Sequence, residues 1–170
     1  LPPPSAARLD AMLRQLAHAR DDASIALAHG GARVGRHRGR IVVHATPPGD
    51  YRAEWHGEPA IALPHGELVF ESASGEGFDP YRATAGLVVR PRRGGERLRL
   101  GHGLARRPIT SLLREADVPP WERAWLPLIL AGDELVAVPG LGVDVAWRPA
   151  LGHAGLVPRW RAKVEPALEA

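Results

Sequence analysis

Glycine and proline together make up 36 of the 170 residues (19 glycines and 17 prolines), and this content limits what the chain can fold into more than any other feature. Both residues destabilise helix interiors, and proline cannot donate a hydrogen bond to a sheet ladder. Long uninterrupted helices and deep parallel sheets are therefore disfavoured. Short strands joined by tight turns are favoured. The hydrophobic fraction of 45% suffices for a modest core, in one domain of ordinary size or in two small ones.

The first half of the chain predicts one helix followed by short strands. Helix 5–20 is expected to begin at Ser5, whose hydroxyl can cap it, and to end at Asp21-Asp22. Its apolar face contains Leu9, Met12, Leu13 and Leu16. Short apolar or alternating runs follow at 25–28, 32–35 and 40–44. Turn residues then separate strands predicted at 51–56, 60–63 and 68–72, a spacing typical of an antiparallel meander.

The second half predicts another strand-rich unit with one short helix. Residues 73–84 lack a regular pattern and are predicted to be a linker. Five strands are predicted after it, at 87–90, 97–100, 126–131, 134–139 and 143–147. Helix 109–116 is expected to begin after Pro108, and Gly132-Asp133 predicts a hairpin turn. We therefore expect an α+β fold with domains at 1–84 and 85–148 and a mobile tail at 149–170.

The net charge of +3 conceals a strong internal division. Residues 1–49 sum to +4, 50–89 to −5, 90–114 to +7 and 115–170 to −3. The central segment has eight arginines against Glu96 alone, and codon bias does not explain it because its neighbours are acidic. A segment this basic is typical of a surface that binds phosphate groups, and a solvated charged face is the alternative.

Motifs for catalysis are absent from the sequence. The chain contains no Gly-x-x-x-x-Gly-Lys phosphate loop, no Gly-x-Gly-x-x-Gly, no Ser-Gly-Gly-x-Asp-Ser adenylation loop and no Gly-x-Ser-x-Gly elbow. Its eight histidines form neither His-x-His nor His-Glu-x-x-His, so metal binding is not expected. The absence of cysteine excludes disulfides, thiol nucleophiles and zinc sites built on Cys-x-x-Cys. We therefore expect no catalytic residue and no cofactor in this chain.

The location and extent of the chain can also be judged from the sequence. Lack of cysteine is compatible with a reducing cytosol, and no apolar run approaches the ~18 residues of a membrane span. We therefore expect a cytoplasmic protein with no membrane partner. The chain starts with Leu1-Pro2-Pro3-Pro4, with neither a methionine nor a signal-peptide pattern, and we expect a fragment or a processed product.

Several ordered motifs resemble one known family. They are Gly95-Glu96-Arg97-Leu98-Arg99, Ser111 to Ala116, Val118-Pro119-Pro120-Trp121-Glu122-Arg123, Leu126 to Ile129, Gly132 to Val138 and Gly140 to Asp144. In order and spacing, residues 93–144 are similar to the C-terminal domain of the tRNA(Ile)-lysidine synthetase family. The first 22 residues resemble the substrate-binding region that precedes that domain.

This resemblance implies the following. The family is an ATP-dependent ligase that joins lysine to C2 of the wobble cytidine in a CAU anticodon. Its ATP and Mg²⁺ site lies in an N-terminal domain whose adenylation loop this chain lacks, so the expected role of the chain is tRNA recognition. The expected partners are tRNA(Ile) with a CAU anticodon, the missing catalytic domain and, in a possible homodimer, a second copy.

Physical reasoning and resemblance together select eight candidate tRNA contacts. They are Arg93, Arg97, Arg99, Arg106, Arg107, Arg114, Trp121 and Arg123. Arg97 and Arg99 would share one face of a strand, whereas Arg106 and Arg107 precede a helix start, where a phosphate can be held. Trp121 either stacks on an unpaired base or packs as a core or lid residue. Arg123 reaches either RNA or a carboxylate near Glu122.

One alternative from another class stays open. The chain would then be a protein-interaction or assembly module, in which the arginines pair with the acidic stretch 50–89 of a neighbouring subunit. Such a module would form an oligomer that is sensitive to salt and indifferent to RNA.

Overall fold

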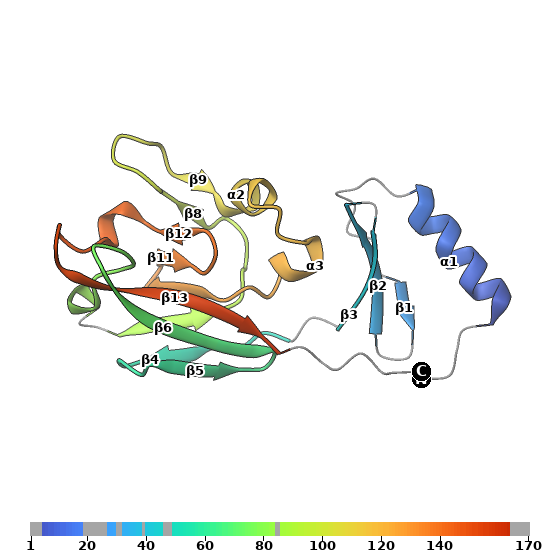
Figure 1. Ribbon diagram of the computed structural model, residues 1–170, viewed down its shortest axis with the longest axis horizontal. Helices are drawn as coiled ribbons and strands as arrows, with labels where there is room; N and C mark the ends of the chain where they lie inside the picture. Colours follow the sequence, from blue (N-terminus) through green and yellow to red (C-terminus); the bar gives the residue numbers. More distant parts are fainter. Residues whose placement is uncertain are drawn as a thin grey trace. The chain divides into compact units, whose positions relative to one another are not determined.

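The computed structural model describes residues 5–18, 27–29, 32–38, 40–45, 49–83 and 86–163. The chain forms two compact units, one from Leu1–Pro47 with Pro119–Ala124 and one from Pro48–Val118 with Trp125–Ala170 (Figure 1). The α+β class is confirmed, with short helices among many short strands. The compact units divide at Pro47 and Pro48, whereas the sequence predicted a domain boundary at residue 84.

The first unit contains the predicted N-terminal helix and a small sheet. Helix α1 spans Ala6–His18, and Ser5 begins it: its carbonyl accepts from the Leu9 N–H at 2.9 Å. The strands β1 (Leu27–His29), β2 (Ala32–His37) and β3 (Arg40–Ala45) form a consecutive antiparallel sheet. A short helix, α3 (Pro120–Arg123), belongs to the same unit, although the sequence predicted no helix there. The predicted ends of the first helix at 19–20 lie outside the described residues.

The second unit is organised around a five-stranded antiparallel sheet. Its strand order is β12 (Gly142–Val143), β11 (Glu134–Val138), β10 (Leu128–Ala131), β7 (Leu87–Arg90) and β4 (Ala53–Trp55). The predicted hairpin at Gly132-Asp133 is confirmed, because Ala131 lies opposite Glu134 and Gly132 has φ 57°. The predicted meander over 51–72 is wrong in part, because β4 pairs with β7 and does not pair with β5.

A second sheet has three strands, and one of them lies in the segment that was predicted to be a mobile tail. Its order is β13 (Ala154–Ala162), β6 (Gly66–Ser74) and β5 (Ala60–Leu63), and β13 runs along β6 over nine residue pairs (Figure 1). The tail predicted at 149–170 is therefore wrong as far as Ala162, and residues 164–170 lie outside the described part. Pro158 sits in an edge strand, where its missing N–H interrupts no ladder on the open side.

The predicted linker at 73–84 is also wrong, because this segment is packed into the second unit. The Phe78 side chain is fully buried, and its backbone exchanges two hydrogen bonds of 2.9 Å with Leu156. Gly77 has φ 80°, and an added Cβ there would overlap the Leu156 carbonyl. Glycine is thus needed for close approach of two chain segments, and its presence does not indicate a linker.

The five-stranded sheet is buried on both faces. One face packs on β6, where Leu68, Phe70, Phe78, Val89 and Ile129 share a core cluster. The other face is covered by the hairpin β8 (Arg97–Leu98) and β9 (Arg107–Pro108) and by helix α2 (Ile109–Glu115). The side chains of this second cluster include Leu98, Ile109, Leu113, Leu128 and Leu130. Burial on both sides explains why β10 and β11 are almost continuously apolar.

Candidate nucleic-acid interface

The β8–β9 hairpin presents arginines on the outer side of the second core cluster. Leu98 points inward and is fully buried, so its neighbours Arg97 and Arg99 are directed away from that core. Leu98 lies opposite Arg107, which brings Arg107 beside this pair across the hairpin. The Arg97 Nη2 also donates to the Arg106 carbonyl oxygen at 2.7 Å. The backbone segments that carry Arg97 and Arg107 are thereby brought side by side in one hairpin.

A buried carboxylate holds this surface in place. Asp144 has 0% exposed area and accepts hydrogen bonds of 3.0 Å from the backbone N–H groups of Arg99 and Ala146. Its oxygens lie 4.0 Å from the Arg99 Nε and 3.8 Å from the Arg106 Nε. Asp144 also precedes the short 3-10 helix η2 (Val145–Trp147), whose Val145 N–H donates to the Arg99 carbonyl at 2.8 Å. One buried carboxylate therefore lies within 4.0 Å of two guanidinium groups, and its hydrogen bonds are with the backbone.

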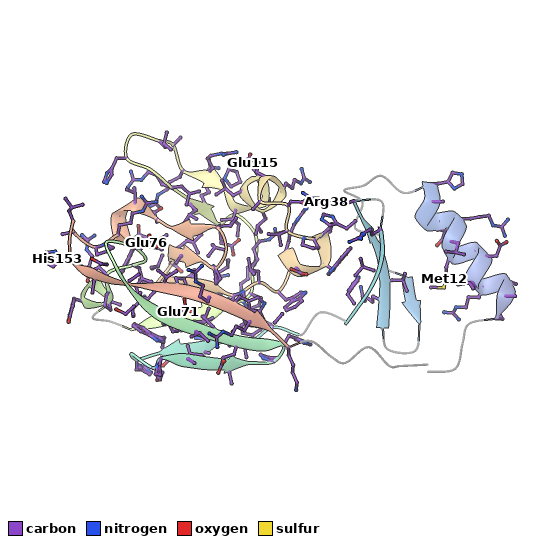
Figure 2. All side chains as sticks on the ribbon, in the orientation of Figure 1. Met12, Arg38, Glu71, Glu76, Glu115 and His153 are labelled. Atoms are coloured by element: carbon purple, nitrogen blue, oxygen red, sulfur yellow. The ribbon has the colours of Figure 1, made fainter. Side chains whose placement is uncertain are left out.

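Arg106 and Arg107 are each paired with an exposed carboxylate from elsewhere in the chain. The Arg106 Nη2 lies 2.7 Å from Glu134 Oε1, and this hydrogen bond, with the Asp144 charge, raises the pKa of Arg106. Arg107 binds Glu115 through two nitrogens, with Nη1 at 2.9 Å from Oε2, which raises the pKa of Arg107 and lowers that of Glu115. Figure 2 labels Glu115 on α2. Ion pairs this exposed contribute little to stability and can exchange.

Glu96 is the acidic residue of the basic segment 90–114, and its carboxylate stabilises the turn before β8 by accepting hydrogen bonds. The Arg90 Nη1 lies 2.9 Å from Glu96 Oε1, with both side chains largely buried. Burial acts to raise the pKa of Glu96, but the Arg93 N–H, the Arg90 guanidinium and the Gly94 N–H donate to it and lower the pKa. Arg90 is thus structural. Arg93 pairs with Asp50 at 2.8 Å on the surface.

Two further arginines complete the arrangement. Arg114 points outward from α2, while Leu112 and Leu113 pack inward. Arg148 follows η2, and its Nη2 donates to the Leu100 carbonyl oxygen at 2.8 Å. Sequence reasoning missed Arg148 because it lies outside the basic segment; its position directly after the last predicted strand, 143–147, was the available signal. We define the arginine surface as Arg97, Arg99, Arg106, Arg107 and Arg148.

Trp121 and Arg123 belong to the first unit, whereas the arginine surface belongs to the second. The Trp121 ring stacks on His44, with centroids 4.6 Å apart and planes 9° apart. It also meets the edge of His37, at 5.9 Å. One ring face is therefore already occupied by a histidine, which favours the packing role for Trp121 over base stacking.

The chemistry of this region is that of an anion-binding surface. Guanidinium groups bind phosphate through fork-shaped donors, and exposed Glu115 and Glu134 occupy the positions that phosphate oxygens would take. In the described part of the chain, no group of three His, Asp or Glu side chains is placed to hold a metal ion. None of the helices in the described ranges is long and apolar enough to cross a membrane.

Comparison with known families gives two matches. A model of the "TilS substrate C-terminal domain" matches residues 87–160, and a model of the "TilS substrate binding domain" matches residues 1–42. The first match contains the whole arginine surface. Together the two models cover most of the chain in the order predicted from the motifs.

Individual relatives agree with these matches. A tRNA(Ile)-lysidine synthase from Ralstonia nicotianae is 36% identical over 89% of this chain, and one from Nitrosomonas europaea is 32% identical over 92%. The matches span only 38% and 36% of those two proteins, so the chain corresponds to little more than a third of their length. A crystal structure of a TilS C-terminal domain aligns with a TM-score of 0.55 at 24% identity, covering 69% of this chain and all of that one, which supports the fold.

Proposed function

We propose that this chain, which belongs to the tRNA(Ile)-lysidine synthase family, binds tRNA through its arginine surface on behalf of that enzyme. The observation that carries the proposal is the assembly of Arg97, Arg99, Arg106 and Arg107 on one hairpin. The buried Asp144 fixes two of these arginines, and exchangeable carboxylates pair with two of them.

The proposal extends to the parent enzyme. The reaction is the ATP-dependent joining of lysine to C2 of the wobble cytidine of tRNA(Ile) with a CAU anticodon, in the cytoplasm. ATP and Mg²⁺ belong to the catalytic part of such an enzyme, and no step of that chemistry is assigned to this chain. The contribution of Arg93, Arg97, Arg99, Arg106, Arg107, Arg114 and Arg148 is to hold phosphates and position the tRNA.

The affinity for tRNA is expected to fall steeply with salt. If about five phosphates are engaged, the plot of log affinity against log salt should have a slope of roughly −4, because each contact releases ~0.7 to 0.9 counterions. Fluorescence anisotropy with labelled tRNA between about 50 and 300 mM salt measures this slope. A flat plot would contradict phosphate binding.

Gel filtration tests the alternative of an assembly module. That alternative draws on the observed pairing of an arginine from the basic segment with Asp50 of the acidic stretch, here within one chain. It requires an oligomer that dissociates in salt and that does not change when tRNA is added. The tRNA-binding proposal requires a shift of the elution volume on addition of tRNA.

Neutralising the carboxylates that pair with Arg106 and Arg107 is expected to raise tRNA affinity. The double variant Glu115→Gln with Glu134→Gln removes two competitors of phosphate, each worth ~0.2 to 1 kcal/mol, so the Kd should fall about twofold to thirtyfold. Asp133→Asn is the control: it removes one carboxylate charge next to Glu134, at an exposed turn position that contacts no arginine within the described ranges. Equal gains in the control and the double variant would show a general charge effect and would not support competition at these arginines.

A further inference from the structure

A groove of about 450 Å³ lies in the second unit, beside the β11–β12 turn and the β13 strand. Its accessible apolar lining includes the partly exposed Leu141 and Val157, whereas the side chains of Val138 and Val143 behind them are buried in the two core clusters. Three charged residues, Glu76, Arg148 and Arg159, also line it. Arg148 belongs to the arginine surface as well, so the groove continues that surface. Four glycines at 75, 77, 140 and 142 leave backbone accessible along the walls.

The loop that carries Glu76 is held rigidly against β13. The Gly75 N–H donates to the His153 carbonyl at 2.8 Å, and Phe78 exchanges hydrogen bonds with Leu156 on the other side. Side chains are excluded at two contacts: an added Cβ at Gly77 would overlap the Leu156 carbonyl, and one at Gly155 would overlap the Glu76 carbonyl. The backbone at Glu76 is therefore pre-organised for binding.

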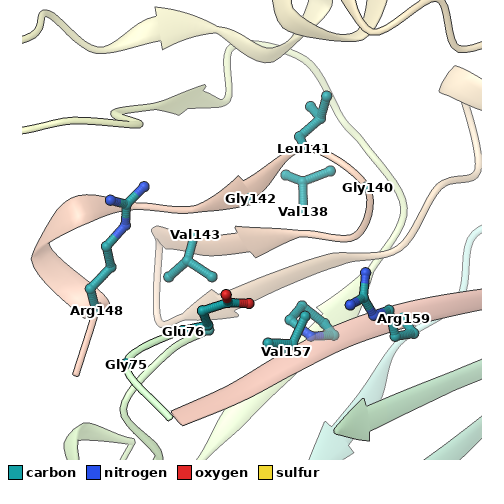
Figure 3. A pocket seen from close by; sticks show the side chains of 12 residues that line it. Gly75, Glu76, Val138, Gly140, Leu141, Gly142, Val143, Arg148, Val157 and Arg159 are labelled. Carbon is teal, nitrogen blue, oxygen red and sulfur yellow. The ribbon is translucent and has the colours of Figure 1, made fainter. Parts of the chain in front are cut away.

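The groove contains one carboxylate and two guanidinium groups, and these groups have hydrogen-bond donors and acceptors left for a ligand. In Figure 3, Glu76 lies between Arg148 and Arg159. The Arg148 Nη2 donates to the Leu100 carbonyl, and the Arg159 Nε lies 3.2 Å from Glu71 Oε2. The Glu76 carboxylate has no hydrogen-bond or ion-pair partner within the described ranges. A guanidinium presents five N–H donors, so both arginines retain donors for a ligand.

We propose that this groove binds one unpaired nucleotide of an RNA. The two arginines hold the flanking phosphates, the partly exposed Leu141 and Val157 side chains contact the base, and the Glu76 carboxylate accepts hydrogen bonds from the base edge. Guanine fits this carboxylate best, because its Watson–Crick edge offers two adjacent donors, N1–H and N2–H. Adenine, cytosine and uracil each place an acceptor beside their donor. This inference rests on the proposed function and adds a base preference to it.

The test uses six-nucleotide RNAs in anisotropy experiments. We expect a U-rich hexamer with one central guanine to bind the chain at least about fivefold more tightly than the same hexamer with uracil, adenine or cytosine there, consistent with the ~1 to 3 kcal/mol of a good bidentate contact. Glu76→Ala should abolish this preference, and Arg159→Ala should weaken binding of every hexamer. Amide shifts of Gly140 and Gly142 on addition of the guanine hexamer report occupancy of the groove independently.

Two matched variants serve as controls. Glu67→Ala removes another exposed glutamate, and Arg161→Ala removes an arginine that also pairs with Glu71, at 3.6 Å, but does not line the groove. Both should keep the guanine preference. The inference is overturned if the four hexamers bind equally or if the preference survives Glu76→Ala. Retained tRNA binding with a steep salt slope in that case would leave the proposed function standing.

Discussion

Replacing Arg106 and Arg107 together by glutamate is expected to lower the affinity for tRNA by about 100-fold, or ~2.7 kcal/mol. Two phosphate contacts are lost and two repulsive charges are introduced on the same hairpin. The slope of log affinity against log salt should also become less steep by roughly 1.5, because each lost contact removes ~0.7 to 0.9. Anisotropy over a salt series gives both numbers from one set of titrations.

The matched control makes the same two charge reversals at arginines outside the hairpin. Arg52→Glu with Arg161→Glu reverses two exposed arginines outside residues 87–160 and should change the affinity by less than about threefold. The folded state should survive the Arg106 and Arg107 substitutions, since exposed ion pairs contribute about 0 to 1 kcal/mol. Unchanged affinity and slope in the hairpin variant would show that the hairpin does not contact the RNA.

Asp144→Ala is expected to reduce the free energy of unfolding by about 3 kcal/mol. The substitution leaves the N–H groups of Arg99 and Ala146 without their acceptor and removes the carboxylate between two guanidinium groups. Urea unfolding followed by tryptophan fluorescence measures the loss. Because Arg99 and Arg106 lose their common anchor, tRNA affinity should also fall under conditions in which the variant is folded.

Two companion variants sharpen that measurement. Asp144→Asn keeps one acceptor oxygen and should lose clearly less stability than the alanine variant. Asp133→Ala removes an exposed turn carboxylate and should change stability by no more than about 0.5 kcal/mol. A loss below about 1 kcal/mol for Asp144→Ala would mean that the backbone contacts of Asp144 do not hold the hairpin.

Local patterns allowed correct prediction of part of the fold. The helix predicted at 109–116 is observed at Ile109–Glu115, and the strand predicted at 87–90 is observed with those bounds. The turn at Gly132-Asp133 joins two strands, as expected. In each case the signal is short-range: helix periodicity after a proline, or two apolar runs on either side of a two-residue turn.

The missed elements depend on contacts between distant residues. β13 shows little alternation of polar and apolar side chains, because only Gly155 and Pro158 in it are buried. β13 is held by backbone hydrogen bonds to β6, and its own sequence pattern does not predict this pairing. In the same way, Gly75 and Gly77 indicated a linker, whereas they allow two chain segments to approach closely.

The sequence allowed us to select the arginines of the candidate site, but it did not allow us to predict which carboxylates pair with them. The count of eight arginines in residues 90–114 selected the segment that the β8–β9 hairpin carries, and its role in binding tRNA stays a prediction. However, the acids that pair with Arg93, Arg106 and Arg107 are Asp50, Glu134 and Glu115, and all three lie outside it. The segment charge of +7 therefore overstates the positive charge that the folded surface presents before a ligand exchanges with these carboxylates.

The pairing of β13 with β6 also constrains the order in which the second unit can fold during synthesis. Residues 66–74 and Phe78 leave the ribosome about 80 residues before the strand that pairs with them. The pairing of β6 with β13 can be completed only after Ala162 has emerged. Until then, the cluster around Leu68, Phe70 and Phe78 lacks the side chains of Leu156 and Trp160 that pack against it. Release of a chain that stops short of β13 therefore yields a product with an open core, which proteases and aggregation remove, even though every arginine of the hairpin is already present.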